Sequence, residues 1–436
     1  MTAYADLTNL TDILKNVYGE GLTNQFKDEK TTYNQFSKSD RKPGGKGYVF
    51  GIRYARTQST GGRAESAPLP DPFTGQKDNG TIVPRYIYGA IRLTGPAVSA
   101  AKANMMAFVD GLADEMEDIY QSILVDLNRQ CHGDGFGLIA TASVIGNAST
   151  AATWALTCDN DTGVMYAQEG MVVDFYNGTA IRTTAAGHRI SVITPSTKVI
   201  QFEQGGQTYL TNHPLVAARS YINSTTALGV NEKMVKMGMQ LASHATTDTP
   251  YEITGLDGIF DDGTLLASFE GITVASYPKW QANVISNASV NRELSIDLML
   301  NACDMTRMRS GMNVDLIRMG MGQRRKYANL LMPEVRYQPT KLLGGYETLT
   351  FSGGDGSIEL LIDPLTQQNK MYFQPRDIVK KYELEPLGWG NLDGDQMHRR
   401  QGYDEWDLFL RLYTNLGCEQ RNALTVMKDL VEPETY

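Results

Sequence analysis

Residues 95–137, GPAVSAAKANMMAFVDGLADEMEDIYQSILVDLNRQCHGDGFG, contain the strongest structural signal in the sequence. Apolar residues recur every three or four positions from Val98 to Leu127, which is the spacing of one face of an α-helix. Pro96 suits the first turn of a helix, and the helix is expected to end near Cys131, before a Gly-Asp-Gly turn. We therefore predict a helix over residues 97–131. At roughly 50 Å it is long for a compact domain and suggests a structural strut.

The segment before this helix predicts a long β-hairpin. Residues 46–54 (KGYVFGIRY) and 82–93 (IVPRYIYGAIRL) are rich in β-branched and aromatic residues, and we expect them to pair. The 27 residues between them contain a Gly-Gly pair and a Pro-x-Pro-x-Pro series. That composition cannot build a core of its own, and a loop of this length is usually functional or disordered.

The segments after the helix predict a mixed chain of the α+β class. Residues 146–250 are rich in Thr, Gly and Asn and predict a β-rich subdomain, with one helix candidate at residues 214–219. The later part alternates helices and short strands. The helices are expected at 292–309 and 322–331, and the strands at 315–319, 348–351, 358–362 and 406–415.

Length and charge limit the class of protein. The chain has 436 residues, 42% hydrophobic and 20% charged, which is enough for two or three folded domains. Its net charge of −9 argues against a dedicated nucleic-acid binder. The charge is unevenly distributed, because residues 1–95 carry 13 basic and 9 acidic residues and the remainder is strongly acidic. The first residues contain no signal peptide, and no apolar run is long enough to span a membrane.

Motifs for catalysis or for metal and phosphate binding are missing from the sequence. There is no phosphate-binding loop, no HExxH and no GxSxG. The four cysteines are far apart and predict reduced, mostly buried thiols rather than a zinc site. Asp159–Gly163 is similar to the start of a calcium loop, but Gly170 occupies the place of the bidentate Glu. We therefore predict no catalytic residue, no metal ligand and no cofactor, and a role that is not enzymatic.

Two charged surfaces are candidates for subunit contacts. Six basic residues and no acidic residue lie in the hairpin region 41–63: Arg41, Lys42, Lys46, Arg53, Arg56 and Arg63. Four acidic residues share one face of the predicted helix, opposite its apolar stripe: Asp110, Asp114, Glu117 and Asp118. The acidic face is either a solvated helix surface or the docking face for the basic hairpin of another subunit. A long hairpin is marginally stable alone and needs a partner surface.

The order of these parts resembles that of the major capsid proteins of tailed bacteriophages, which have the Hong-Kong-97-like capsid fold. Each motif alone is degenerate, and their order along nearly the whole chain carries the resemblance. The resembling stretches are GKGYVFGIRYARTQSTGG (45–62), PRYIYGAIRLTGPAV (84–98), the helix 97–132 with CHGDGFG after it, and residues 255–280, 294–331 and 371–430.

The resemblance implies a division of the subunit into named parts. Residues 1–40 correspond to an N-arm and residues 41–95 to an extended loop, the E-loop. A peripheral domain comprises residues 96–145, with a spine helix at 97–131, and returns as a C-terminal segment at 371–436. Residues 251–370 correspond to the apical domain. We interpret residues 146–250 as a β-rich insertion in or beside the apical domain.

The resemblance also implies function and partners. The subunits would form hexamers and pentamers of an icosahedral phage head, and the shell would enclose double-stranded DNA without sequence-specific contacts. A portal protein, a separate scaffolding protein and decoration proteins are the expected partners, with no membrane. The expected location is the virion, after assembly in the cytoplasm of the host bacterium. The alternatives are an encapsulin-like compartment shell and, from another class, a β-rich hydrolase or surface-binding protein.

Overall fold

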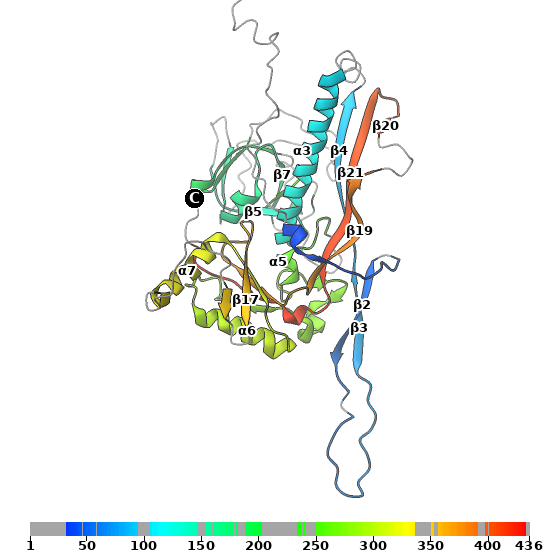
Figure 1. Ribbon diagram of the computed structural model, residues 1–436, viewed down its shortest axis with the longest axis vertical. Helices are drawn as coiled ribbons and strands as arrows, with labels where there is room; N and C mark the ends of the chain where they lie inside the picture. Colours follow the sequence, from blue (N-terminus) through cyan, green and yellow to red (C-terminus); the bar gives the residue numbers. More distant parts are fainter. Residues whose placement is uncertain are drawn as a thin grey trace, which may run out of the picture. The chain divides into compact units, whose positions relative to one another are not determined.

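The computed structural model describes most of the chain from Thr32 to Glu432. The described residues are 32–45, 47–57, 59–94, 105–146, 154–158, 161–177, 180–181, 188–202, 233–237, 239, 250–335, 350–352, 356–390, 397–399 and 401–432. They form sheets of five, six and seven strands, two two-stranded ribbons and a few helices (Figure 1). This mixture of sheets and helices agrees with the predicted α+β class.

The predicted long helix is present as α3, Met105–His132, within the described residues. It packs on the five-stranded sheet, whose order is β1-β19-β21-β20 with β4 also paired to β21 (Figure 1). Gly89 of β4 allows this close approach, because a Cβ there would lie 2.6 Å from the Cδ1 atom of Ile123 on the helix. The strands are β1 (Ser37–Lys38), β4 (Arg85–Thr94), β19 (Val379–Trp389), β20 (Met397–Arg399) and β21 (Glu405–Cys418).

The predicted hairpin exists, but its second strand was predicted wrongly. Strand β2 (Tyr48–Ala55) pairs with β3 (Gln76–Ile82), whereas β4 pairs with the C-terminal strand β21. Pro84 lies between β3 and β4 and has no N–H group for a sheet ladder, so the strand predicted over residues 82–93 is interrupted there. The loop between the paired strands therefore covers residues 56–75 only.

The predicted β-rich region, residues 146–250, belongs to a seven-stranded antiparallel sheet with its own core, but the first strand of this sheet begins at Leu138, before the predicted boundary. Its order is β11-β5-β6-β10-β9-β7-β8, and an additional pairing of β11 with β7 closes six of the strands into a ring. Leu156, Phe175, Phe202 and Met234 are buried inside it. The strands are β5 (Leu138–Gly146), β6 (Trp154–Cys158), β7 (Val172–Asn177), β8 (Ala180–Ile181), β9 (His188–Thr194), β10 (Val199–Phe202) and β11 (Lys233–Lys236). Helix α4 (Asp161–Tyr166) follows β6, and the helix candidate at 214–219 lies outside the described residues.

The six-stranded sheet has the order β14-β22-β18-β15-β17-β16 and carries two helices, α6 (Ile296–Ser310) and α7 (Met321–Val335) (Figure 1). Helix α6 begins later than predicted because the Ser295 side chain caps it, accepting a hydrogen bond from the backbone N–H of Leu298 at 3.2 Å. Its strands are β14 (Asn283–Ile285), β15 (Leu316–Met319), β16 (Thr350–Ser352), β17 (Ser357–Ile362), β18 (Met371–Gln374) and β22 (Thr425–Met427).

The segment after residue 371 supplies strands to two sheets. Strands β18 and β22 belong to the six-stranded sheet, and β19, β20 and β21 belong to the five-stranded sheet. The boundary expected at residue 371 therefore does not separate two sheets. Met371, Tyr372 and Phe373 are fully buried between β15 and β22, so the chain leaves the six-stranded sheet only after β18.

Short elements connect the sheets. The part of the predicted N-arm that is described starts with the 3-10 turn Thr32–Gln35, whose Tyr33 packs in the main core next to buried Phe36. The others are α5 (Leu256–Ile259), the ribbon of β12 (Ser268–Phe269) and β13 (Ile272–Thr273), and the 3-10 turns Pro195–Thr197, Val274–Ser276, Pro278–Trp280 and Arg421–Ala423.

Candidate assembly surfaces

The base of the β2–β3 hairpin is held firmly by the rest of the subunit. Tyr48, Phe50 and Ile52 of β2 alternate with exposed residues and face the core. On the other strand, the hydroxyl group of Tyr277 donates a hydrogen bond to Asp78 Oδ2 at 2.5 Å, and the backbone N–H of Thr81 donates to the carbonyl of Glu270 at 2.8 Å. The direction of the hairpin is thus set by contacts near its base.

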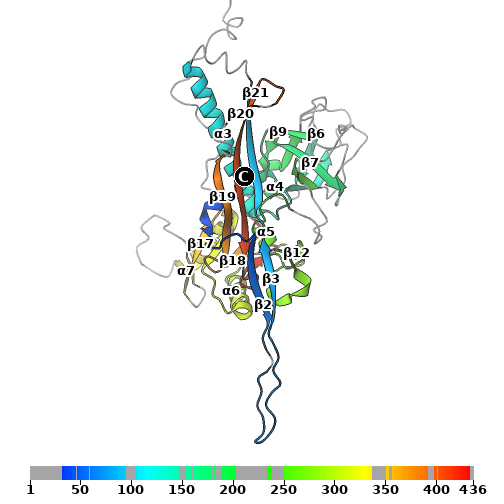
Figure 2. The ribbon, with the colours of Figure 1, turned by 90° about the vertical axis from the view of Figure 1, so that its right-hand side faces the viewer.

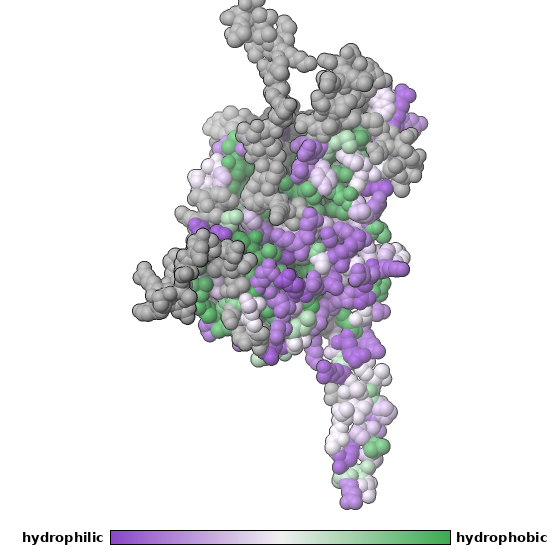
Figure 3. Space-filling model, viewed as in Figure 1, coloured by the Kyte–Doolittle hydropathy of each residue, from purple (hydrophilic) through white to green (hydrophobic). Residues whose placement is uncertain are grey.

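The loop 56–75 at the other end of the hairpin is almost fully exposed. The hydrogen bonds of its described residues lie within the loop itself, for example from Arg63 Nε to the carbonyl of Pro68 at 3.2 Å. Leu69 is 85% exposed and Phe73 63% exposed. In Figures 1 and 2 no other described segment lies beside the loop, and Figure 3 shows apolar residues on its surface. The loop therefore buries little apolar surface within its own subunit.

The basic residues predicted as an interface have different surroundings. Arg53, Arg56 and Arg63 are exposed on the hairpin and its loop. Arg41 is exposed but bonded within the chain, because its Nη2 atom lies 2.7 Å from Glu419 Oε2. Arg41 is thus partly neutralised in its own subunit, which the sequence pattern did not predict. Lys42 is exposed, and Lys46 lies outside the described residues.

The acidic residues of the helix are described only in part. Glu117 and Asp118 are exposed on α3. Asp110 and Asp114 belong to the same helix, but their side chains lie outside the described residues. Within one subunit, no ion pair of the described residues links this acidic face to the basic hairpin.

A buried carboxylate at the hairpin base is a feature that the sequence did not reveal. Glu270 occupies the turn between β12 and β13, and its Oε1 atom accepts a hydrogen bond from the backbone N–H of Cys418 at 2.9 Å. Its Oε2 atom is buried without a hydrogen-bond partner among the described residues. Burial raises the pKa of Glu270 to about 8, against the lowering effects of the Cys418 N–H and Arg421.

We expect Glu270 to make the subunit less stable as the pH rises. The unfolded chain loses this proton near pH 4.5, whereas the folded chain holds it until about pH 8, so the folded state binds more protons between these values. The free energy of unfolding should therefore fall with rising pH in this window, by up to about 1.4 kcal/mol per pH unit from this group. Urea unfolding of Glu270→Gln from pH 5 to 8 should give a flatter profile than wild type. Glu65→Gln, at an exposed position, should keep the wild-type slope, and an unchanged slope in Glu270→Gln would contradict the assignment.

A buried group of charges joins α3 to the seven-stranded sheet. Arg129, near the end of α3, bonds both Asp126 and Glu252, and Lys236 of β11 lies 2.8 Å from Asp126 Oδ2. Burial alone would raise the pKa of Asp126, but Arg129 and Lys236 outweigh it and keep that pKa below its usual range. Because these charges satisfy each other, the ring of strands is fixed to the last turns of the helix.

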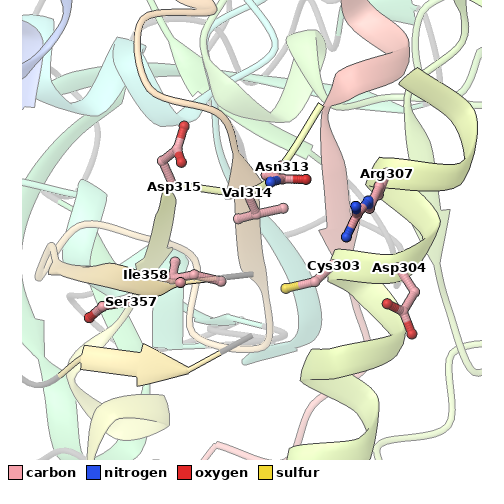
Figure 4. A pocket seen from close by; sticks show the side chains of 9 residues that line it. Cys303, Asp304, Arg307, Asn313, Val314, Asp315, Ser357 and Ile358 are labelled. Carbon is pink, nitrogen blue, oxygen red and sulfur yellow. The ribbon is translucent and has the colours of Figure 1, made fainter. Parts of the chain in front are cut away.

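One small cavity lies between α6 and the six-stranded sheet (Figure 4). Its volume of about 60 Å³ is room for a few water molecules. Cys303, Asp304 and Arg307 of α6 line one side, and Val314 and Ile358 line the other.

Among the described residues, no three His, Cys, Asp or Glu side chains are grouped so that they could hold a metal ion. In the same part of the chain, every helix is too short or too polar to cross a membrane.

The four cysteines agree with the prediction of reduced thiols. None of them forms a disulfide. Cys131, Cys158 and Cys418 are buried, and Cys303 is half-buried beside the cavity. Burial raises the pKa of both Cys131 and Cys418, so these thiols are protonated at neutral pH.

Comparison with solved structures assigns the fold. No family model matches the chain, and no curated protein matches its sequence. The chain is similar to a chain of the cyanophage A-1(L) capsid asymmetric unit, with 13% identity and a TM-score of 0.54 over 96% of this chain and 98% of that chain. The capsid of Myoviridae phage XM1 matches at 7% identity and a TM-score of 0.42, over 94% and 97% of the two chains.

The likeness to the cyanophage chain extends over almost the full length of both proteins. The fold is therefore that of a phage capsid chain, and the resemblance predicted from the order of sequence motifs is confirmed at the level of the fold.

Proposed function

We propose that this chain is the major capsid protein of a tailed phage and self-assembles into hexamers and pentamers of an icosahedral head. The observation that carries the proposal is the full-length likeness to a cyanophage capsid chain. The hairpin supports it, because an exposed loop with apolar residues needs a partner surface. In this interpretation the hairpin is the extended loop of the fold and α3 is its spine helix.

The charge of the subunit fits a shell that encloses DNA without binding it specifically. A net charge of −9 is repeated in every copy, so the packaged phosphates would be repelled rather than held. Stability of the shell would come from many modest contacts repeated by symmetry, each exposed ion pair contributing about 0.2–1 kcal/mol. A scaffolding protein, a portal protein and decoration proteins belong to the same proposal as partners.

Electron microscopy of the expressed protein tests the proposal directly. We expect closed shells or capsomers, whereas dispersed monomers would contradict it. The contents of particles isolated from infected cells distinguish a phage head from an encapsulin-like compartment. Packaged DNA supports a phage head, and enclosed protein cargo would support an encapsulin-like compartment.

The double variant Arg53→Glu/Arg56→Glu should reduce assembly without unfolding the subunit. Arg53 lies opposite Lys77 in the β2–β3 ladder, so the first change replaces a like-charge pair by an opposite-charge pair within the hairpin. The subunit should keep its unfolding midpoint, while particle yield should fall at least tenfold if the basic hairpin contacts acidic surface of a neighbour.

The matched control is Lys279→Glu/Arg325→Glu, which makes the same charge change at exposed positions outside the hairpin. Particle yield measured by gradient sedimentation should stay near wild type for the control. Normal particles from Arg53→Glu/Arg56→Glu would show that charge docking of the hairpin is wrong.

A further inference from the structure

Three tyrosines form an exposed aromatic surface on the five-stranded sheet. Side chains of β4 alternate, so that Gly89 faces α3 while Tyr86 and Tyr88 point away from it. Tyr86 is 57% exposed and Tyr88 59% exposed. Tyr413 of β21 lies directly across from Tyr86, and its ring centroid is 5.1 Å from that of Tyr86 and 5.8 Å from that of Tyr88. We call Tyr86, Tyr88 and Tyr413 the tyrosine platform.

Two arginines on the strands of the platform are paired within the subunit. Arg411 places its guanidinium group 6.0 Å from the centre of the Tyr413 ring, and its Nη2 atom lies 2.7 Å from Glu385 Oε1. Farther along the same two strands, Arg92 Nε lies 2.7 Å from Asp407 Oδ1. Because these charges have partners, the exposed feature that remains for recognition is the set of aromatic rings.

The tip of the β2–β3 hairpin has the complementary chemistry. Residues 68–73 read Pro-Leu-Pro-Asp-Pro-Phe, and we call them the proline-rich tip. Each proline fixes its backbone φ angle and lacks an N–H donor, so little conformational entropy is lost when the segment is ordered. Proline-rich segments with this property dock on surfaces lined by aromatic rings. Leu69 and Phe73 add exposed apolar surface.

The tip cannot reach the platform of its own subunit while the hairpin is intact. The paired part of the hairpin extends over the eight residues of β2, roughly 25 Å. Strand β4 starts three residues after the base end of β3, which is the end opposite to the tip. The platform and the tip are two different surfaces of one chain, and a contact between such surfaces in successive copies produces rings when the rotation closes.

We propose that the proline-rich tip of one copy docks on the tyrosine platform of the next copy around a ring. This inference rests on the proposed function, because it requires self-assembly of the chain. It assigns the hairpin loop a residue-level partner surface, separate from the charge contacts predicted for Arg53 and Arg56.

Engineered disulfides test the contact in assembled particles. Phe73→Cys combined with Tyr88→Cys should give covalent oligomers on a non-reducing denaturing gel after mild oxidation. The control combines Phe73→Cys with Val290→Cys, because Val290 is 63% exposed but lies outside the platform. We expect most Phe73→Cys/Tyr88→Cys subunits to be cross-linked and the control to remain monomeric. Particles without cross-links, or equal cross-linking in the control, would overturn the docking.

Tyrosine nitration tests the same contact without any substitution. It is the deciding experiment in the case that the cysteine variants do not assemble. In wild-type particles Tyr86 and Tyr88 should be nitrated at least about tenfold more slowly than in unassembled subunits. Tyr251, which is 48% exposed, serves as the internal reference and should change much less. Equal protection at the three positions would overturn the docking while leaving the proposed function intact. No particles at all from the wild-type chain would contradict the proposed function itself and the docking with it.

Discussion

Replacing Arg421 by methionine should lower the free energy of unfolding by about 2–4 kcal/mol. The Arg421 side chain is fully buried, and its Nη2 and Nε atoms donate to the carbonyls of Gly258 and Ile259 at 2.9 and 2.8 Å. Both carbonyls belong to α5, and the loss of these donors would leave them buried without partners. The guanidinium group also lies over the rings of Phe269, at 4.4 Å, and Trp280, at 5.4 Å, and that contact would be lost.

Burial of the Arg421 charge lowers the stability of the folded state. This effect opposes the loss of stability expected for Arg421→Met. Desolvation lowers the pKa of Arg421 to about 10, so removing the charge relieves part of the cost of the site. The donor and ring contacts outweigh this relief because methionine supplies neither. Urea unfolding followed by fluorescence measures the change. Arg376→Met, which removes an exposed ion pair with Glu359, should change the midpoint little. A midpoint for Arg421→Met equal to that control would contradict the role assigned to the guanidinium group.

Gly255→Ala should cost at least about 3 kcal/mol of stability or prevent soluble folding. A Cβ atom at residue 255 would lie 2.3 Å from the carbonyl oxygen of Gln130 and 2.4 Å from that of Cys131. Both are backbone atoms in the last turn of α3, so they cannot rotate away as a flexible side chain would. The φ angle of Gly255 is −84°, which other residues adopt freely, and the effect therefore comes from space alone.

The control for this prediction is Gly62→Ala in the hairpin loop. An added Cβ there would meet no atom within 4 Å, and the subunit should unfold at the wild-type denaturant concentration. Circular dichroism during urea titration compares the two variants. If Gly255→Ala unfolds together with wild type, the contact between the end of α3 and the start of α5 must be looser than described.

Local signals in the sequence were sufficient for helices α3, α6 and α7 and for several strands, whereas α4 and α5 were not predicted. Helix α3 was predictable because its apolar stripe persists over many turns, and α6 was predicted from its apolar spacing, although the cap at Ser295 makes it begin later than predicted. The partner of β4 was not predictable from local signals. Residues 85–94 alternate like the second strand of a hairpin, but their partners are residues 405–414, more than 300 positions later. Only the tertiary fold selects between these two pairings.

The candidate surfaces also combine features visible in the local sequence with contacts between residues far apart in the chain. Arg53 and Arg56 are exposed on the hairpin, and their role as a subunit interface stays a prediction. The pairing of Arg41 with Glu419 depends on residues that are 378 positions apart. Glu270 looks like an ordinary residue of a Glu-Gly turn, and its carboxylate is buried only because Cys418 comes to it from the distant end of β21. The rings of Tyr86 and Tyr413 likewise meet only through the pairing of β4 with β21.

Strand β21 lies at the centre of the five-stranded sheet and is synthesised long after β4. At the usual 5–20 residues per second, roughly 15–60 s separate the two strands on the ribosome. During that time β4 has no sheet partner, and Tyr86 and Tyr88 have no Tyr413 beside them. A nascent chain at this stage therefore has no finished five-stranded sheet. If the proline-rich tip docks on the tyrosine platform as proposed, growing chains on one messenger RNA lack the complete docking surface until near the end of translation.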